Sequence, residues 1–349
     1  MLETLKKENM KSRYTSRAII IAALLFLLPS FGRVGVGFIY AQQQRPKIGL
    51  VLGGGGAKGA AHAGALQIIE EVGIPIDYIA GTSIGSIVGG LYACGYRSKQ
   101  IQDMFLSQEW ASLLTDRSDS LRHKIYGKDK DGVGYVFGFP VHRKGTKKAD
   151  ESKGIIRGDN IIELLDSMLG QYKDSMNFNN LPIPFRCVAA NMEKKEEVVF
   201  KEGKLSTAMR SSMSIPGVFK AVTLDSLELL DGGMLNNLPV DIVKEMGADI
   251  IIAIDLTQNK HEGEDSERKN PLKLKGILGW AIERPDLEKY QENRQDADVY
   301  INPDLEGYGA ASFKPEAIKE MMKRGYEAAK KERKSLEDLR NKILVLPLR

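Results

Sequence analysis

The stretch Asp77-Tyr78-Ile79-Ala80-Gly81-Thr82-Ser83-Ile84-Gly85-Ser86-Ile87-Val88-Gly89-Gly90-Leu91 contains an extended apolar run, a Gly-x-Ser-x-Gly turn and a run of small apolar residues. This order predicts a strand, a sharp turn and a buried helix, as in a nucleophile elbow that holds a serine hydroxyl above a sheet. The flanking glycines permit a strained backbone and close packing. The same residues also fit a plain glycine-rich turn in which Ser83 caps the helix. The pattern therefore leaves the role of Ser83 open.

A glycine-rich loop precedes this turn in the chain. Residues 47–52 predict a buried strand and residues 60–72 a helix, with Gly53-Gly54-Gly55-Gly56-Ala57-Lys58-Gly59 between them. Backbone N–H groups at a helix N-terminus favour an anion, which is a phosphate, a bound nucleotide or the oxyanion of a tetrahedral intermediate. Glycine suits the last role because it has no side chain to keep a carbonyl oxygen from the amides.

A third pattern lies much further along the chain, where Asp231-Gly232-Gly233 follows the apolar run Leu227-Glu228-Leu229-Leu230. An aspartate at the carboxyl end of a strand, followed by two glycines, is expected to point into open space.

These three patterns, in this order, resemble the patatin-like phospholipase family. That family has a glycine-rich oxyanion loop followed by Arg or Lys and Gly, then Gly-x-Ser-x-Gly, then Asp-Gly-Gly or Asp-Gly-Ala. Two further blocks are similar to the family's, Ser211–Phe219 and Asn236–Val240. The ordered blocks extend from residue 47 to residue 240, which makes the resemblance far more specific than any single motif.

The resemblance implies a three-layer α/β/α sandwich with a mainly parallel sheet and a Ser–Asp catalytic dyad. In that dyad Ser83 is the nucleophile that attacks an ester carbonyl, and Asp231 is the general base. The oxyanion hole would come from Gly54, Gly55 and Gly56, with Lys58 nearby. Many relatives have Arg at that position, and Lys keeps the charge but lacks the rigid fork of a guanidinium group. The implied substrate is a phospholipid or another acyl ester.

The dyad needs no histidine, and the four histidines of the chain are scattered at positions 62, 123, 142 and 261. His62, in the first helix, is the candidate for a Ser-His-Asp triad, and we expect it instead to be packed or to support the site. A free aspartate has a pKa of about 3.9, which is too low for an efficient base at neutral pH. We therefore expect a dry site that raises the basicity of Asp231.

The N-terminal segment resembles an export leader. Basic residues precede the unbroken apolar run Ala18–Leu28, and a cleavage site is possible after Ala41. Residues 1–41 are thus expected to be a signal peptide or an N-terminal anchor, and the protein to be exported. These residues hold six Lys or Arg and two Asp or Glu, so the remainder carries 44 charges of each sign. This balance argues against a nucleic-acid partner, whereas a membrane surface is an expected partner.

Residues 45–345 are expected to form one α/β domain, since strand-like and helix-like runs alternate along them. Asp159 is predicted to cap a helix that ends at Leu169, and residues 315–343 are predicted to form a closing helix bent at Gly325. Cys94 and Cys187 are expected to be isolated thiols. No cofactor is predicted, and no metal either, because no Cys or His cluster has zinc-ligand spacing.

Two segments interrupt this alternation, residues 116–154 and 258–282. The first contains the apolar island Val133–Pro140 and the second the apolar run Ile277–Ile282. Each is a possible lid or insert beside the site, although core packing explains both as well.

Two other classes of protein stay open. Gly54-x-Gly56-x-x-Gly59 fits a dinucleotide fingerprint, with Asp77 as the acidic residue that follows, and this predicts a Rossmann-type oxidoreductase. That alternative leaves Ser83 and Asp231 unexplained. A non-catalytic lipid-binding protein on the same fold is the other.

Overall fold

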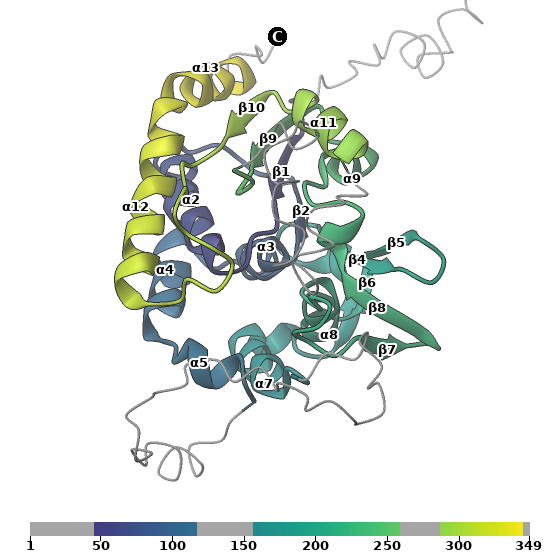
Figure 1. Ribbon diagram of the computed structural model, residues 1–349. Coiled ribbons are helices and arrows are strands. Elements are labelled where there is room, and N and C mark those ends of the chain that lie inside the picture. Colours follow the sequence, from purple (N-terminus) through teal and green to yellow (C-terminus); the bar gives the residue numbers. More distant parts are fainter. Residues whose placement is uncertain (1–44, 117–155, 259–286, 345–349) are drawn as a thin grey trace, which may run out of the picture. The chain divides into compact units, whose positions relative to one another are not determined.

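An eight-stranded sheet forms the centre of the computed structural model, which describes residues 45–116, 156–258 and 287–344 (Figure 1). The strand order is β10-β9-β1-β2-β4-β8-β7, with β5 paired to β4. Strands β10, β9, β1, β2 and β4 are mutually parallel, whereas β5, β7 and β8 run antiparallel to their neighbours. The strands of the sheet are β1 (Ile48–Leu52), β2 (Tyr78–Thr82), β4 (Phe185–Asn191), β5 (Glu196–Phe200), β7 (Val222–Leu224), β8 (Leu227–Asp231), β9 (Ile250–Ile254) and β10 (Val299–Ile301).

Helices cover the sheet, and a small two-stranded sheet of β3 (Ser175–Asn177) and β6 (Glu202–Lys204) stands apart from it. The α-helices are α2 (Ala60–Val72), α3 (Ile84–Ala93), α4 (Ser98–Ser107), α5 (Trp110–Leu113), α7 (Asp159–Leu169), α8 (Leu205–Ser212), α9 (Val240–Glu245), α11 (Leu287–Gln295), α12 (Pro315–Lys331) and α13 (Arg333–Leu344). Four short 3-10 helices complete the described part: η1 (Gly56–Gly59), η2 (Gly170–Tyr172), η3 (Phe178–Asn180) and η4 (Gly232–Met234).

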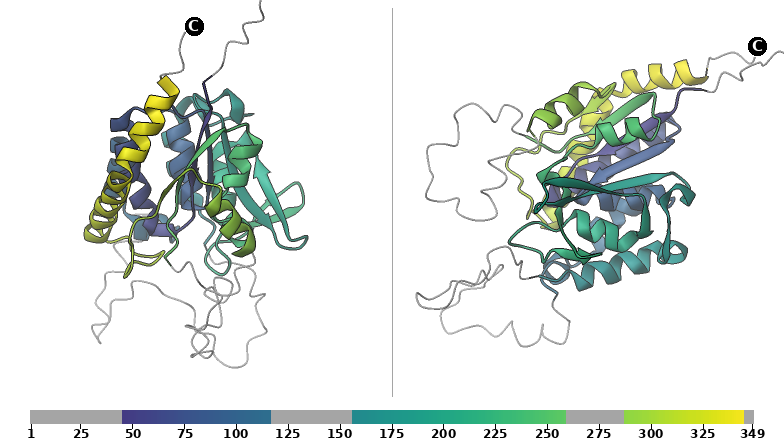
Figure 2. Two further views of the ribbon diagram at one scale, coloured as in Figure 1. Left: turned by 90° about the horizontal axis from the view of Figure 1, so that it is seen from above. Right: turned by 90° about the vertical axis from the view of Figure 1, so that its right-hand side faces the viewer.

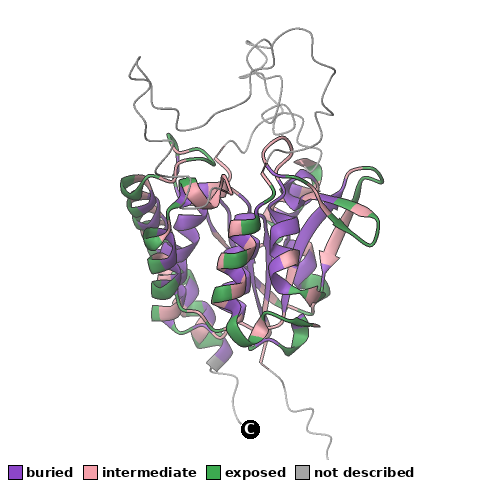
Figure 3. Ribbon diagram, turned by 90° about the horizontal axis from the view of Figure 1, so that it is seen from below, coloured by how far each residue is buried: buried purple, intermediate pink, exposed green. Residues whose placement is uncertain are grey.

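Alternate residues of the strands face opposite sides, and each side has its own apolar cluster. Leu50 of β1 packs in the larger cluster, with α2, α3, α4 and α12, whereas its neighbour Val51 packs in the smaller one, with α9 and Tyr290 of α11. Because both faces are covered, the central strands are buried while the outer faces of the helices are exposed (Figure 3). This confirms the predicted three-layer α/β/α fold with a mainly parallel sheet.

Helix α12 crosses α2 at very short range (Figures 1 and 2). A Cβ on Gly64 would lie 1.9 Å from the Met322 carbonyl oxygen, and a Cβ on Gly325 would lie 2.0 Å from that of Ala61. Gly325 is therefore a packing residue rather than the predicted bend. The closing helix breaks instead at Glu332, between α12 and α13.

The start of α7 also differs from the prediction. Gly158, at φ 78°, precedes the helix, and Asp159 is its first residue. The carboxylate of Asp116 accepts hydrogen bonds from the backbone N–H of Gly158 at 2.7 Å and of Asn160 at 3.3 Å. A side chain 42 residues upstream thus satisfies amides at this helix start, which local sequence did not reveal.

Cys94 and Cys187 are free thiols, as expected. Within the described ranges, no helix has the length and apolar character needed to cross a bilayer. The leader at residues 1–41, the island Val133–Pro140 and the run Ile277–Ile282 lie outside the described residues.

Candidate active site

Strand β4 brings the serine turn and the aspartate together. Val188 pairs with Thr82 of β2, and the next residue, Ala189, pairs with Asp231 of β8. Both β4 residues also pair with β5, so β2 and β8 share the opposite edge of β4. Strand β8 therefore begins to pair where β2 ends, and Asp231 lies beside the turn that starts at Ser83.

Ser83 occupies a strained turn between β2 and α3. Its φ of 54° and ψ of −125° lie outside the ordinary regions for a side-chain-bearing residue. A hydrogen bond from Ser83 N–H to Ser212 Oγ, at 2.9 Å, helps to hold this conformation. Gly85 is needed here, because a Cβ would lie 2.1 Å from the Leu52 carbonyl oxygen.

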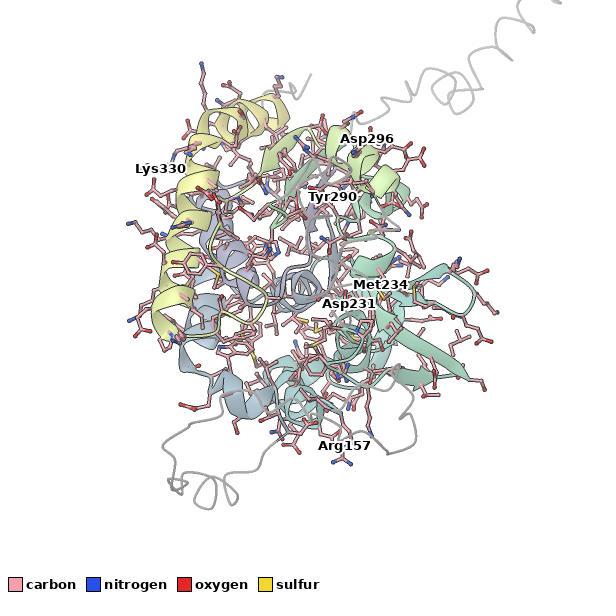
Figure 4. The ribbon with its side chains drawn as sticks, in the orientation of Figure 1. Arg157, Asp231, Met234, Tyr290, Asp296 and Lys330 are labelled. Atoms are coloured by element: carbon pink, nitrogen blue, oxygen red, sulfur yellow. The ribbon has the colours of Figure 1, made fainter. Side chains whose placement is uncertain are left out.

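The hydroxyl of Ser83 does not cap α3. It donates instead to Asp231 Oδ2 at 2.7 Å, and both side chains are buried, with 5% and 2% of their surface exposed. The structure therefore brings together the two residues predicted to form the dyad. Asp231 lies deep among the elements around β4 and α8 (Figure 4).

The electrostatic environment of Asp231 matches the expectation of a dry site. Burial raises the pKa of this carboxyl to about 6, and hydrogen bonds from Gly233 N–H and the Ser83 hydroxyl oppose the rise. The Gly233 amide donates to Oδ1 at 2.8 Å, so Oδ2 is the oxygen that serves the serine. The backbone of Asp231 is fixed by its N–H, which donates to the Ser214 carbonyl at 3.0 Å.

The glycine-rich loop lies directly against Ser83. A Cβ on Gly54 would be 3.2 Å from Ser83 Cβ and 2.4 Å from Asn237 Oδ1, so only glycine fits there. The Gly54 N–H donates to the Asn237 carbonyl at 3.2 Å. Among the residues that the structure describes, the N–H groups of Gly55 and Gly56 have no acceptor. Of the three glycines predicted to form the oxyanion hole, Gly54 thus has a paired N–H, whereas Gly55 and Gly56 do not.

Lys58 and His62 support the loop from its helical end. Lys58 Nζ donates to the Leu256 carbonyl at 3.2 Å, which ties the loop to the chain after β9. His62 is fully buried and its Nε2 lies 2.8 Å from the Gly53 carbonyl oxygen. Desolvation lowers the pKa of His62 to about 4. This histidine contacts the loop, not Ser83, in agreement with the expected supporting role.

Three further residues around the site were not singled out from the sequence. Ser212 accepts from Ser83 N–H, and Asn237 accepts from Gly54 N–H. Arg210 is 1% exposed and donates to Ser214 Oγ at 2.6 Å, beside the carbonyl that holds Asp231. All three lie in or beside the blocks Ser211–Phe219 and Asn236–Val240, which was the available signal, but only the folded chain assigns each a contact.

The geometry also weakens the dinucleotide alternative. Asp77 Oδ2 accepts from Ile48 N–H at 2.8 Å, at the start of β1. The glycine-rich loop follows the other end of that strand. The acidic residue of a dinucleotide site must reach a ribose near the loop, but Asp77 lies at the opposite end of the parallel strands.

Within the described residues, no group of three His, Cys, Asp or Glu side chains is placed to hold a metal ion.

A mainly parallel sheet, a strained Gly-x-Ser-x-Gly turn and a contacting aspartate define the class of α/β proteins built around a serine at a strand-to-helix turn. The model of the patatin-like phospholipase family matches residues 50–244, more than half of the 349-residue chain. The chain belongs to the patatin-like phospholipase family.

Its relatives include much longer proteins. Patatin-like phospholipase domain-containing protein 6 of Mus musculus is 34% identical over 214 residues, which cover 60% of this chain and 13% of that protein. Lysophospholipase nte1 of Aspergillus fumigatus is 34% identical over 211 residues, covering 60% and 12%. An uncharacterized NTE family protein of Mycobacterium tuberculosis is 33% identical over 211 residues, covering 60% and 49%. The chain thus spans a small part of the first two and about half of the third.

Two solved structures are similar at low identity. VipD from Legionella pneumophila has a TM-score of 0.45 at 17% identity, covering 83% of this chain and 67% of that one. The ExoU–SpcU complex from Pseudomonas aeruginosa has a TM-score of 0.42 at 19% identity, covering 84% and 52%.

Proposed function

We propose that this protein is a serine acyl hydrolase that cleaves carboxylic ester bonds of phospholipids or related lipids through a Ser83–Asp231 dyad. The observation that carries the proposal is the 2.7 Å hydrogen bond from Ser83 Oγ to Asp231 Oδ2, in a buried site beside two amides without an acceptor in the described structure. A carboxylate in contact with the serine hydroxyl can take its proton without an intervening histidine.

In the first half of the proposed reaction, Ser83 Oγ attacks the ester carbonyl carbon while its proton passes to Asp231 Oδ2. The carbonyl electron pair moves onto oxygen, and the N–H groups of Gly55 and Gly56 stabilise the resulting oxyanion. When the carbonyl re-forms, the bond to the alcohol oxygen breaks, and the proton on Asp231 goes to that leaving oxygen. The product is an acyl ester on Ser83.

In the second half, water replaces the alcohol. Asp231 takes a proton from the water, and the water oxygen attacks the acyl carbonyl. Collapse of this second tetrahedral intermediate breaks the bond to Ser83 Oγ, which recovers its proton from Asp231. The pKa of about 6 supports this role, because a base works best when its pKa lies near the pH of the reaction.

Family membership supports a lipid substrate, and the name of the fungal relative specifies lysophospholipase activity for that protein. We extend the proposal to a membrane surface as the place of action and to residues 1–41 as an export leader or anchor, on the basis of the apolar run Ala18–Leu28. Fractionation of producing cells, with the N-terminus of the recovered protein determined by mass spectrometry, tests the leader. Recovery of the intact N-terminus in the cytoplasm would contradict it.

A fluorophosphonate probe tests the chemistry. It should label Ser83, as mapped by mass spectrometry, and block hydrolysis of phospholipid and lysophospholipid in mixed micelles. Ser83→Ala and Asp231→Asn should each abolish hydrolysis while far-ultraviolet circular dichroism stays unchanged. Ser211→Ala is the matched control, since the Ser211 hydroxyl bonds to the Thr207 carbonyl within α8. Lipid binding by the wild type without labelling or turnover would instead favour a non-catalytic lipid-binding protein.

A further inference from the structure

The peptide group between Gly53 and Gly54 is hydrogen-bonded at both its carbonyl oxygen and its N–H. Its carbonyl oxygen lies 2.8 Å from His62 Nε2, and its N–H donates to the Asn237 carbonyl at 3.2 Å. A peptide group is planar, so two hydrogen bonds on opposite ends fix the direction of the whole plane. Gly53 is also anchored by its own N–H, which donates to the Ile254 carbonyl at 3.0 Å.

The next peptide plane, which carries the Gly55 N–H, has no such restraint among the described residues, whereas the Gly55 carbonyl accepts from Lys58 N–H at 3.3 Å and so restrains the plane that carries the Gly56 N–H. Gly55 and Gly56 have no side chains, their N–H groups have no acceptor in the described part of the chain, and Gly56 has a φ of 58°. The loop is anchored again at Ala57, whose N–H donates to the Ala310 carbonyl at 2.8 Å. The direction of the Gly55 amide therefore depends on the anchored planes on either side of it, because glycine alone allows many conformations.

The imidazole of His62 is suited to be one of these anchors. A carbonyl oxygen only accepts, so Nε2 must carry the hydrogen, which makes Nδ1 the unprotonated ring nitrogen. Nδ1 is buried and has no partner among the described residues. The low pKa of the ring keeps it in this neutral form near neutral pH. His62 comes from α2, whose position is set by its close packing on α12, so the donor is held on a rigid element.

We infer that His62 is a positioning residue for the reaction: through its hydrogen bond to the Gly53 carbonyl it aims the amide of Gly55 at the oxyanion, beside the amide of Gly56. This inference rests on the proposed function. His62 acts through the loop and transfers no proton. Its loss should weaken binding of the tetrahedral transition state and leave binding of the planar ester almost unchanged, because the loop amides matter most after the oxyanion forms.

Three substitutions separate this role from simple packing. The amide nitrogen of Gln is as many bonds from Cα as His Nε2, whereas that of Asn matches Nδ1, so His62→Gln keeps a donor for Gly53 and His62→Asn does not. His62→Phe keeps a ring and removes the donor. The measurements are kcat and KM on a soluble p-nitrophenyl ester and the affinity for a trifluoromethyl ketone, which forms a tetrahedral adduct with serine. The matched methyl ketone, which stays planar, reports ground-state binding.

The Asn and Phe variants should lose about tenfold or more in kcat and in trifluoromethyl ketone affinity, with KM and methyl ketone affinity within about twofold. The Gln variant should recover most of both losses. Three outcomes would each overturn the inference. They are a kcat that is the same in all three variants, a Gln variant whose kcat is as low as that of the Asn variant, and a change in the Asn and Phe variants that is confined to KM. If the Phe variant does not fold, the Gln and Asn pair decides. Absence of ester turnover by the wild-type protein would instead refute the proposed function itself.

Discussion

Ser83 and Asp231 are 148 residues apart in the chain, and the hydroxyl of one donates to the carboxylate of the other at 2.7 Å. The hydrogen bond is direct, and His62, the residue considered for a Ser-His-Asp triad, bonds to the Gly53 carbonyl instead. In the proposed reaction this buried carboxylate serves as both the proton acceptor and the group that orients the hydroxyl. The chemistry of the site then depends on the charge state of Asp231.

The rate of ester hydrolysis should rise with pH through about 6. Only the ionised form of Asp231 accepts the serine proton, and burial raises the pKa of this carboxyl to about 6. A profile of kcat/KM between pH 4.5 and 8 on an uncharged ester should show one acidic limb near that value. A profile that is flat over this range would contradict the role of Asp231. His62 cannot produce the limb, because its pKa is lowered to about 4.

The raised pKa of Asp231 should also make stability depend on pH. The contribution of this carboxyl to the free energy of unfolding should fall as pH rises, whereas the rate of hydrolysis should increase. Between pH 3.8 and about 6 the folded protein keeps a proton on Asp231 that the unfolded chain releases, so this group stabilises the fold at low pH and the contribution is lost as pH rises. The Asp231→Asn variant lacks this dependence. Its free energy of unfolding relative to wild type should therefore improve by about 1 to 3 kcal/mol between pH 4 and pH 7.

Urea titrations at both pH values measure this difference. His62 contributes with the opposite sign, but it is present in both proteins and cancels in the comparison. If the difference in free energy of unfolding between variant and wild type is the same at the two pH values, burial does not raise the pKa of the Asp231 carboxyl.

Ser212→Ala should lower kcat by about tenfold, because Ser83 N–H loses its acceptor and the strained turn relaxes. It should also cost about 1 to 3 kcal/mol of stability, because the Ser212 hydroxyl also donates to the Val188 carbonyl at 2.5 Å and both buried partners lose a hydrogen bond. Ser211→Ala is the control, since its hydroxyl bonds within α8 to the Thr207 carbonyl. Steady-state kinetics and thermal melts of both variants test this. Similar kcat values in the two variants would show that the Ser212 bond does not hold the nucleophile.

Gly325→Ala should destabilise the fold by about 1 to 3 kcal/mol. The new Cβ would lie 2.0 Å from the Ala61 carbonyl oxygen and force α12 away from α2. Gly309→Ala is the matched control, because nothing lies within 4 Å of a Cβ there. Thermal unfolding should separate the two variants clearly. Equal melting temperatures would mean that the two helices are not in tight contact.

Much of this architecture follows from local pattern. The alternating apolar runs predict the layers, and the glycines around residues 53–59 and 81–85 mark the two loops where strands turn into helices, because these features depend on near neighbours in the chain. The same local patterns marked Ser83, Asp231 and the glycine-rich loop as candidates, and the family resemblance supplied the roles predicted for them. Two local predictions were wrong because a residue distant in the sequence decides the structure. Asp116, not Asp159, supplies the acceptors at the start of α7, and Gly325 allows close packing of α12 on α2 instead of a bend.

The amino-acid sequence alone determines which chemical groups are present and which local turns carry them. Tertiary pairing settled the rest. Residues Val188 and Ala189 of β4 place Thr82 and Asp231 side by side, and the Asn237 carbonyl accepts the hydrogen bond of the Gly54 amide. These outcomes depend on hydrogen bonds between segments that are distant in the sequence, and such segments meet only when both faces of the sheet are packed.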